Sequence, residues 1–149
     1  MPNAPPLSVL TILLRLAIAF AVALPLAWER QTGGRLGLRT VPLVSVGACG
    51  YLLLSLALGE SPEGNARLLQ GILTGIGFIG GGAIVKRGTD VVGIATAATI
   101  WNMGAVGSAA AYGQYALAVL LAATNIVILE VGGLMHAFDA ARSKKNEKP

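Results

Sequence analysis

The sequence has little charge and few residues of the kinds that build catalytic or metal sites. Asp, Glu, Lys and Arg make up 12% of its 149 residues, against about a quarter in an ordinary soluble domain. A water-soluble protein of this size could not cover its surface with so few charges. The low charge therefore excludes an ordinary soluble domain and favours a membrane protein.

Cysteine and histidine each occur once, as Cys49 and His136. A single cysteine inside an apolar segment provides neither a disulfide framework nor a pair of metal ligands, and we interpret it as a small buried hydrophobe. No serine stands beside a histidine and an acid, and the seven carboxylates are scattered along the chain. We therefore expect no enzymatic activity, no cofactor and no metal site.

Aromatic residues are also scarce, at 5% of the chain, and the net charge of +4 does not come from basic residues interleaved with them. The basic residues form short clusters at the ends of apolar segments, which is the distribution of membrane orientation signals. We expect no nucleic-acid partner.

Hydrophobic residues, by contrast, make up 54% of the chain, and they recur in segments near the length of about 20 residues that crosses a bilayer core. The first is longer than the apolar core of a cleavable signal peptide and is not preceded by a basic residue, so we expect it to be retained. The pattern predicts an all-α integral membrane bundle in residues 1–136, in contact with the lipid bilayer, and a basic cytoplasmic tail in 137–149. The five predicted transmembrane helices are 7–28, 41–58, 67–85, 91–112 and 115–136.

The positions of the basic residues predict the orientation of this bundle. Cytoplasmic loops carry an excess of Lys and Arg. With the N-terminus outside, the cytoplasmic segments contain nine of the eleven basic residues, namely Arg30, Arg35, Arg39, Lys86, Arg87, Arg142, Lys144, Lys145 and Lys148. The other two are Arg67, at the outer end of segment 67–85, and Arg15, within segment 7–28. We therefore predict a multi-pass protein with its N-terminus outside and its C-terminus inside.

Segment 67–85 contains the motif Gly75-Ile-Gly-Phe-Ile-Gly80, which matches the dinucleotide-binding pattern G-x-G-x-x-G. That pattern has meaning only between a strand and a helix, with an acidic residue about 20 positions later. Here the glycines lie within a predicted membrane helix, and the position 20 beyond Gly80 is Ile100. We do not interpret the motif as a nucleotide site.

The glycines of this segment have two other interpretations. Small residues allow helices to approach closely in lipid, so segment 67–85 could be the central packing helix of the bundle. Alternatively, Gly80, Gly81 and Gly82 could unwind the segment and expose backbone groups to a cavity, as in transporters with broken helices. A polar and small stripe with alternating spacings of three and four follows one face of the predicted helix: Arg67, Gln70, Thr74, Gly77 and Gly81. Gly75, four residues after Gly71, marks a second small-residue face.

Segment 91–112 carries Thr96, Thr99 and Asn102 at successive spacings of three, on one broad helical face. Such side chains usually form hydrogen bonds between membrane helices. The functional alternative is that they face the stripe of segment 67–85 and bound a shared site with it.

Three further polar residues lie within predicted membrane segments: Arg15, Asn125 and Glu130. Such residues are candidates for a functional site because their burial in lipid is costly. Arg15 could instead bind carbonyl groups or a carboxylate of the bundle. A pair between Arg15 and Glu130 is disfavoured, because their predicted depths differ by about 10 Å at 1.5 Å per residue.

Several motifs between Glu29 and Tyr115 resemble the MgtC/SapB family of bacterial inner-membrane proteins. They are Gly37-Leu-Arg39-Thr40, Arg67 and Gln70 before Thr74-Gly-Ile-Gly-Phe-Ile-Gly-Gly-Gly-Ala-Ile84, and Gly93-Ile94 before Thr96-Ala-Ala-Thr-Ile-Trp101. The resemblance implies five membrane helices in the inner membrane and no established enzymatic activity. It also implies links to magnesium limitation, acid stress and survival in host cells, with members that modulate other membrane complexes such as the F-type ATP synthase or that are discussed in relation to magnesium transport.

The chain departs from the virulence-linked members of this family in two respects. Those members carry a polar residue, often Asn, where this chain has Ala95, and they continue into a soluble regulatory domain that we do not expect here. The departures weaken the transfer of a virulence-type role. They leave the membrane placement and the importance of Arg39 and the two motif-bearing helices unaffected.

Two functional hypotheses follow. The preferred one is a non-enzymatic membrane modulator that docks a membrane-protein partner, or a second copy of itself, through the surface of segments 67–85 and 91–112. The alternative is an oligomeric channel or carrier for a cation or small solute, which would use Arg15, Asn102, Asn125, Glu130 and the Gly80–Gly82 run.

Overall fold

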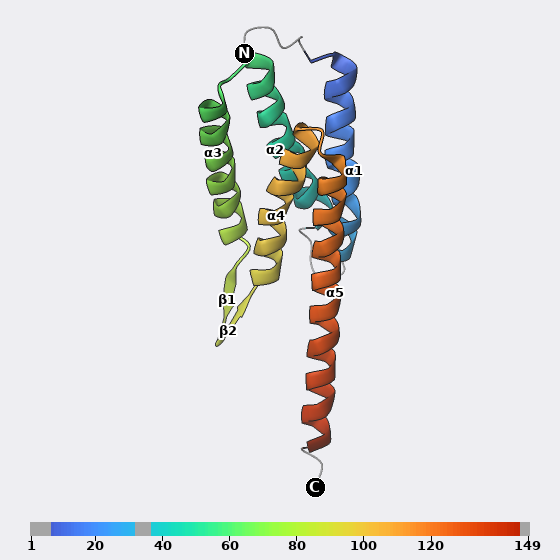
Figure 1. Ribbon diagram of the computed structural model, residues 1–149. Helices are drawn as coiled ribbons and strands as arrows, with labels where there is room; N and C mark the ends of the chain where they lie inside the picture. Colours follow the sequence, from blue (N-terminus) through green and yellow to red (C-terminus); the bar gives the residue numbers. More distant parts are fainter. Residues whose placement is uncertain (1–6, 32–36, 147–149) are drawn as a thin grey trace.

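The computed structural model describes residues 7–31 and 37–146, and in these residues it contains five α-helices and one β-hairpin (Figure 1). The expected all-α class is confirmed. Arg35 and Lys148, which entered the orientation argument, lie outside the described residues. The elements are α1 (Val9–Gln31), α2 (Gly37–Leu58), α3 (Pro62–Gly81), β1 (Val85–Arg87), β2 (Asp90–Val92), α4 (Ile94–Ala111) and α5 (Tyr115–Asn146).

Several helices begin or end away from the predicted positions. α3 begins at Pro62 instead of Arg67, since the Ser61 hydroxyl accepts a hydrogen bond from the Gly64 N–H at 3.1 Å and proline suits a first turn. α2 begins at Gly37, so Arg39 lies in its first turn and not in the preceding loop. α5 runs through most of the expected tail to Asn146.

A β-hairpin replaces the tight loop expected between the third and fourth helices. Its strands are antiparallel, with Val85 opposite Val92, Lys86 opposite Val91 and Arg87 opposite Asp90. Gly88 in the turn has φ +63°, a backbone conformation that glycine adopts without strain. The clustered charges suggested a loop, but the flanking valines favour extended backbone.

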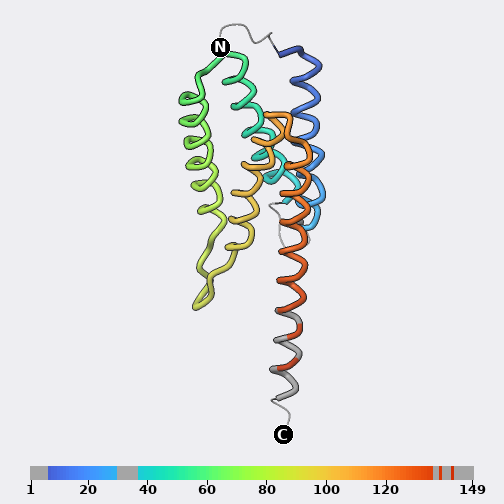
Figure 2. The backbone as a smooth tube through the Cα atoms, in the orientation of Figure 1, coloured from blue at the N-terminus to red at the C-terminus, as the bar shows by residue number. Residues whose placement is uncertain are grey.

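The helices run up and down, and α3 lies at the edge of this arrangement (Figures 1 and 2). α1, α2, α4 and α5 form the closely packed part of the bundle, while α3 packs against α2 and α4. The C-terminal part of α5 extends well beyond the other helices. The prediction that segment 67–85 is the central packing helix is therefore wrong.

The central packing helix is α4, because its small residues let α2 approach its backbone. A Cβ atom added at Gly107 would collide with the carbonyl oxygen of Ser45, whereas one added at Gly77 of α3 would meet nothing within 4 Å. The Ser45 hydroxyl donates to the carbonyl of Ala19 at 2.9 Å, which links α2 to α1 near the same place. Half of α4 is buried: Thr99, Ile100, Met103, Gly104, Val106, Gly107, Ala109, Ala110 and Ala111.

The Gly80–Gly82 run ends α3 and does not interrupt it. The Gly82 N–H donates to the Phe78 carbonyl at 3.1 Å, and the Ala83 N–H donates to the Gly80 carbonyl at 3.0 Å. The backbone groups freed there are those of an ordinary helix end. The interpretation of this run as a mid-helix break is therefore wrong.

Three helices in the described residues are long and apolar enough to cross a membrane: Val9–Glu29, Gly37–Leu58 and Tyr115–Met135. Many of their large apolar side chains are exposed, such as Leu10, Leu43 and Leu120. Such an apolar surface is stable against lipid but unfavourable in water. The protein is therefore a membrane protein.

The contact at Gly107 predicts the effect of adding one methyl group there. We expect Gly107→Ala to lower the free energy of unfolding by about 1–3 kcal/mol, because the new Cβ forces α2 and α4 apart. Gly50→Ala in α2 is the matched control, since a Cβ there meets nothing within 4 Å and alanine favours helix. Thermal unfolding in detergent measures both variants. Equal melting temperatures for the two would contradict the central role of this contact.

Candidate functional site

The polar and small stripe predicted on the third helix lies on the face of α3 that points away from the bundle. Ile76 and Gly80 are the buried residues of α3, and they occupy the opposite face, at helical spacing. The stripe residues are all exposed: Arg67, Gln70, Thr74, Gly77 and Gly81. We call these five residues the outer stripe.

The outer stripe has few internal hydrogen bonds. The Thr74 hydroxyl donates to the Gln70 carbonyl at 2.8 Å, within its own helix. Within residues 7–31 and 37–146, no hydrogen bond joins the side chain of Gln70 or Arg67 to another group. A Cβ added at Gly77 or Gly81 would meet nothing within 4 Å. The stripe therefore offers free polar groups and an accessible backbone.

The structure does not bring Thr96, Thr99 and Asn102 to this stripe, so their predicted shared site with it is not formed. The buried Thr99 hydroxyl donates to the Ala95 carbonyl at 2.9 Å. The Asn102 amide donates to the Leu121 carbonyl of α5 at 3.3 Å, and Thr96 is half-buried. The hydrogen bond from Asn102 to α5 fits the interpretation that these polar side chains link membrane helices.

The contact between α3 and α4 uses other residues. A Cβ at Gly80 would lie 3.1 Å from the Ala97 carbonyl oxygen, and one at Gly104 would lie 2.5 Å from Cδ1 of Ile76. Gly80 of α3 and Gly104 of α4 therefore allow the C-terminal half of α3 to pack close to α4. The outer stripe is left facing outward as a consequence.

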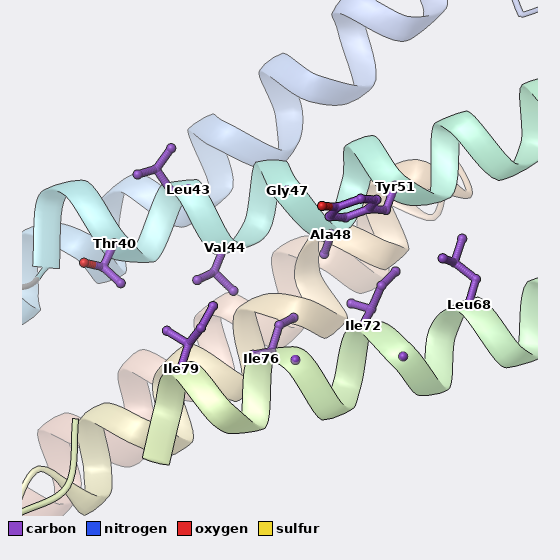
Figure 3. Close-up of a pocket in the computed structure, with 12 residues that line it drawn as sticks. Thr40, Leu43, Val44, Gly47, Ala48, Tyr51, Leu68, Ile72, Ile76 and Ile79 are labelled. Atoms are coloured by element: carbon purple, nitrogen blue, oxygen red, sulfur yellow. The ribbon is translucent and has the colours of Figure 1, made fainter. Parts of the chain in front are cut away.

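A groove of about 600 Å³ lies between α2 and α3 (Figure 3). Val44 and Ala48 of α2 point towards α3, while Ile72 and Ile79 of α3 point towards α2. The groove is almost wholly apolar, and its lining residues are Thr40, Leu43, Val44, Gly47, Ala48, Tyr51, Leu68, Gly71, Ile72, Gly75, Ile76 and Ile79.

Three glycines keep this groove open, since a Cβ at Gly47, Gly71 or Gly75 would meet nothing within 4 Å. Gly75 is the one predicted site residue in the lining. The other lining residues could not be identified from the sequence, because apolar side chains lie on every face of α2. The spacing of Gly71 and Gly75 was the only available signal, and it did not identify α2 as the facing helix.

Arg15 caps the C-terminal end of α4. Its Nη1 donates to the carbonyl of Ala111, while its Nε is buried without a partner in the described residues. The last carbonyls of a helix have no partner within the helix, and a positive charge there also interacts favourably with the helix dipole. Arg15 thus binds a backbone carbonyl of the bundle, which is one of the two structural roles suggested for it by the sequence.

The other two intramembrane candidates lie on α5. Asn125 is half-buried, and Glu130 is exposed. No ion pair joins Arg15 to Glu130 in the part of the chain that the structure describes, since the Arg15 guanidinium is at Ala111. The same residues contain no group of three or more His, Cys, Asp or Glu side chains placed to hold a metal ion. The three candidates are therefore dispersed over the bundle.

The cap on α4 predicts different effects for Arg15 and Glu130. We expect Arg15→Met to lower the free energy of unfolding by about 1.5–3 kcal/mol, the usual contribution of a hydrogen bond to a charged group. Glu130→Gln removes an exposed carboxylate and should leave the free energy of unfolding unchanged. Melting temperatures in one detergent compare the two variants. Equal destabilisation by both would indicate that the two residues act as a pair.

Comparison with known proteins adds the family. The model of the MgtC family matches residues 16–138. The chain is 42% identical to an uncharacterized protein of Synechocystis over 109 residues, 72% of this chain and 46% of that protein. It is 38% identical to the protein MgtC of Salmonella typhimurium over 117 residues, 78% of this chain and 49% of the relative.

A third relative is YhiD of Escherichia coli K12, whose name refers provisionally to magnesium transport. It is 32% identical over 127 residues, 80% of this chain and 59% of YhiD. The chain thus spans about half the length of these relatives, and no solved structure matches it. The family model covers most of the chain, including α2, α3, α4 and the hairpin. The chain therefore belongs to the MgtC family.

Proposed function

We propose that this protein is a non-enzymatic membrane protein that acts in magnesium homeostasis or stress adaptation by binding another membrane protein, or a second copy of itself, through the outer stripe of α3. The observation that carries the proposal is the direction of that stripe. A polar, glycine-containing face points away from the bundle, where it would otherwise meet lipid.

The proposed topology is five membrane crossings in the bacterial inner membrane, with the N-terminus outside and the C-terminus inside. α3 and α4 have 20 and 18 residues and extend about 30 and 27 Å at 1.5 Å per residue, close to the thickness of a bilayer core. Arg39 at the start of α2, the basic hairpin and the end of α5 lie towards the same end of the molecule (Figure 1). This arrangement suits the positive-inside rule.

Lipid is a poor neighbour for the outer stripe. The amide of Gln70 would lack hydrogen-bond partners in hydrocarbon, where unpaired polar groups are costly. A facing helix supplies such partners, and Gly77 and Gly81 allow its backbone to come close. Arg67, near the start of α3, can reach headgroups or an acidic residue of the partner.

The connection with magnesium rests on the family and on the names of relatives, one of which refers to magnesium transport. The scattered carboxylates and the lack of a catalytic motif in the sequence favour a binding role over an enzymatic one. We propose no cofactor for this role.

The outer stripe predicts a specific loss of association. We expect Gly77→Leu and Gly81→Leu to weaken association with a second copy or a membrane partner at least tenfold, because leucine keeps the facing backbone away. Energy transfer between differently labelled copies in vesicles measures self-association, and cross-linking followed by co-purification detects partners. Growth of the native host under magnesium limitation, with the variant replacing the natural protein, reports on function.

Gly47→Leu, on the exposed part of α2, is the control variant for this experiment and should retain association. All variants must first be shown to insert in the membrane and to elute as folded protein. Unchanged self-association and unchanged co-purification in both stripe variants would contradict the proposal.

A second candidate function is an oligomeric channel or carrier for a cation or small solute. Glu130 favours it, because an exposed carboxylate within an apolar helix is a candidate ion ligand. We expect transport of this kind to appear as flux of magnesium or protons in reconstituted vesicles and to be lost in Glu130→Gln. Wild-type vesicles without flux for common ions would exclude this candidate.

A further inference from the structure

The groove between α2 and α3 is an apolar hollow on the surface of a membrane protein. Among the described residues that line it, Thr40 and Tyr51 have the polar side chains, so water finds few hydrogen-bond partners there. Its volume of about 600 Å³ lies within the range of about 300–1,000 Å³ typical of small-molecule sites. The surrounding bilayer can fill it with hydrocarbon.

The length of the groove matches one leaflet of the bilayer. Along α2 it extends from Thr40 to Tyr51, which corresponds to about 17 Å at 1.5 Å per residue. The hydrocarbon core is about 30 Å thick, so one leaflet contributes about half of that. An acyl chain occupies one leaflet, so the length of the groove suits such a chain.

The two ends of the groove differ in charge. Thr40 and Ile79 lie at one end, while Leu68 and Tyr51 lie towards the other (Figure 3). Arg39 is exposed next to Thr40. The opposite end carries Glu60 in the α2–α3 turn, and Glu63 and Arg67 near the start of α3.

The hairpin that follows α3 adds to the positive charge at the Arg39 end. All six residues of its strands are exposed. Asp90 lies opposite Arg87 and offsets the charge of Arg87. Lys86 lies opposite the uncharged Val91, so no facing carboxylate in the hairpin offsets the charge of Lys86. The N-terminal dipole of α2 favours an anion at this end, and the C-terminal dipole of α3 opposes it to a similar degree. The balance of charge is set by Arg39 and Lys86.

We propose that this groove binds an anionic phospholipid, with one acyl chain between α2 and α3 and the phosphate near Arg39 and Lys86. The site lies on the face of α3 towards α2, whereas the outer stripe lies on its outward face. The lipid site therefore does not depend on the proposed docking function, and the two can be tested separately.

Variants that fill the groove test the position of the acyl chain. Gly47→Leu and Gly75→Leu place a side chain in the open space of the groove from two different helices, without a clash at Cβ. Gly77→Leu is the matched control, because it makes the same change on the outward face of α3. The full chain, delipidated in mild detergent, is titrated with phosphatidylglycerol, and native mass spectrometry records the bound lipid.

We expect Gly47→Leu and Gly75→Leu each to weaken phosphatidylglycerol binding at least fivefold and Gly77→Leu to leave it unchanged. Elution volume and melting temperature confirm that each variant is folded. Wild-type binding in both groove variants would overturn the proposal. Unchanged lipid binding together with loss of a co-purifying protein would overturn it in favour of a protein helix in the groove.

Headgroup variants test the polar end. Arg39→Gln and Lys86→Gln should reduce the preference for phosphatidylglycerol over phosphatidylcholine at least threefold, with Arg67→Gln as the control at the other end of α3. Inorganic phosphate should not compete with the lipid if the acyl chain provides most of the affinity. Competition by phosphate alone, or an unchanged preference in both variants, would contradict the assignment of the headgroup.

Discussion

Gly107 of α4 packs directly against the carbonyl oxygen of Ser45 in α2, where an added Cβ atom would collide. Within lipid, apolar side chains gain little by leaving their surroundings, so helix association depends on close backbone packing and on hydrogen bonds. The Gly107 contact provides the first, and the bond from Ser45 to Ala19 provides the second. α1, α2 and α4 are assembled around this point.

The central position of α4 leaves α3 at the edge, with two faces that differ in chemistry. One face meets α4 at Gly80 and Ile76 and, next to that contact, forms a groove with α2. The other carries the outer stripe. A single helix thus presents an apolar hollow suited to an acyl chain and a polar, small-residue surface suited to another helix. Changes to one face should leave the other unaffected, because the helix backbone separates them.

Polar groups in the interior serve mainly to satisfy helix backbones. Arg15 binds the last carbonyl of α4, and Asn102 binds a carbonyl of α5. Arg15 thus connects α1 to the distant α4, and Asn102 connects α4 to the next helix, α5. Their side chains therefore contribute to the assembly of the bundle, and the residues that remain free for function lie on its surface.

The amino-acid sequence by itself determined the all-α class, the approximate positions of the helices, the membrane setting and the family. These properties follow from local features, namely runs of apolar residues, clusters of basic residues and the motifs around Thr74 and Thr96. The exposed residues of the outer stripe were also identified, since helical spacing places residues on a common face.

The tertiary structure alone decided which helix is central, what the stripe faces and where the groove lies. α3 is rich in glycine and α4 is rich in alanine, so the small-residue pattern could not distinguish the packed helix from the peripheral one. The difference depends on which backbone a glycine meets, Ser45 for Gly107 and nothing within 4 Å for Gly77. Close packing is a property of two surfaces together, and a pattern along one helix describes only one of them.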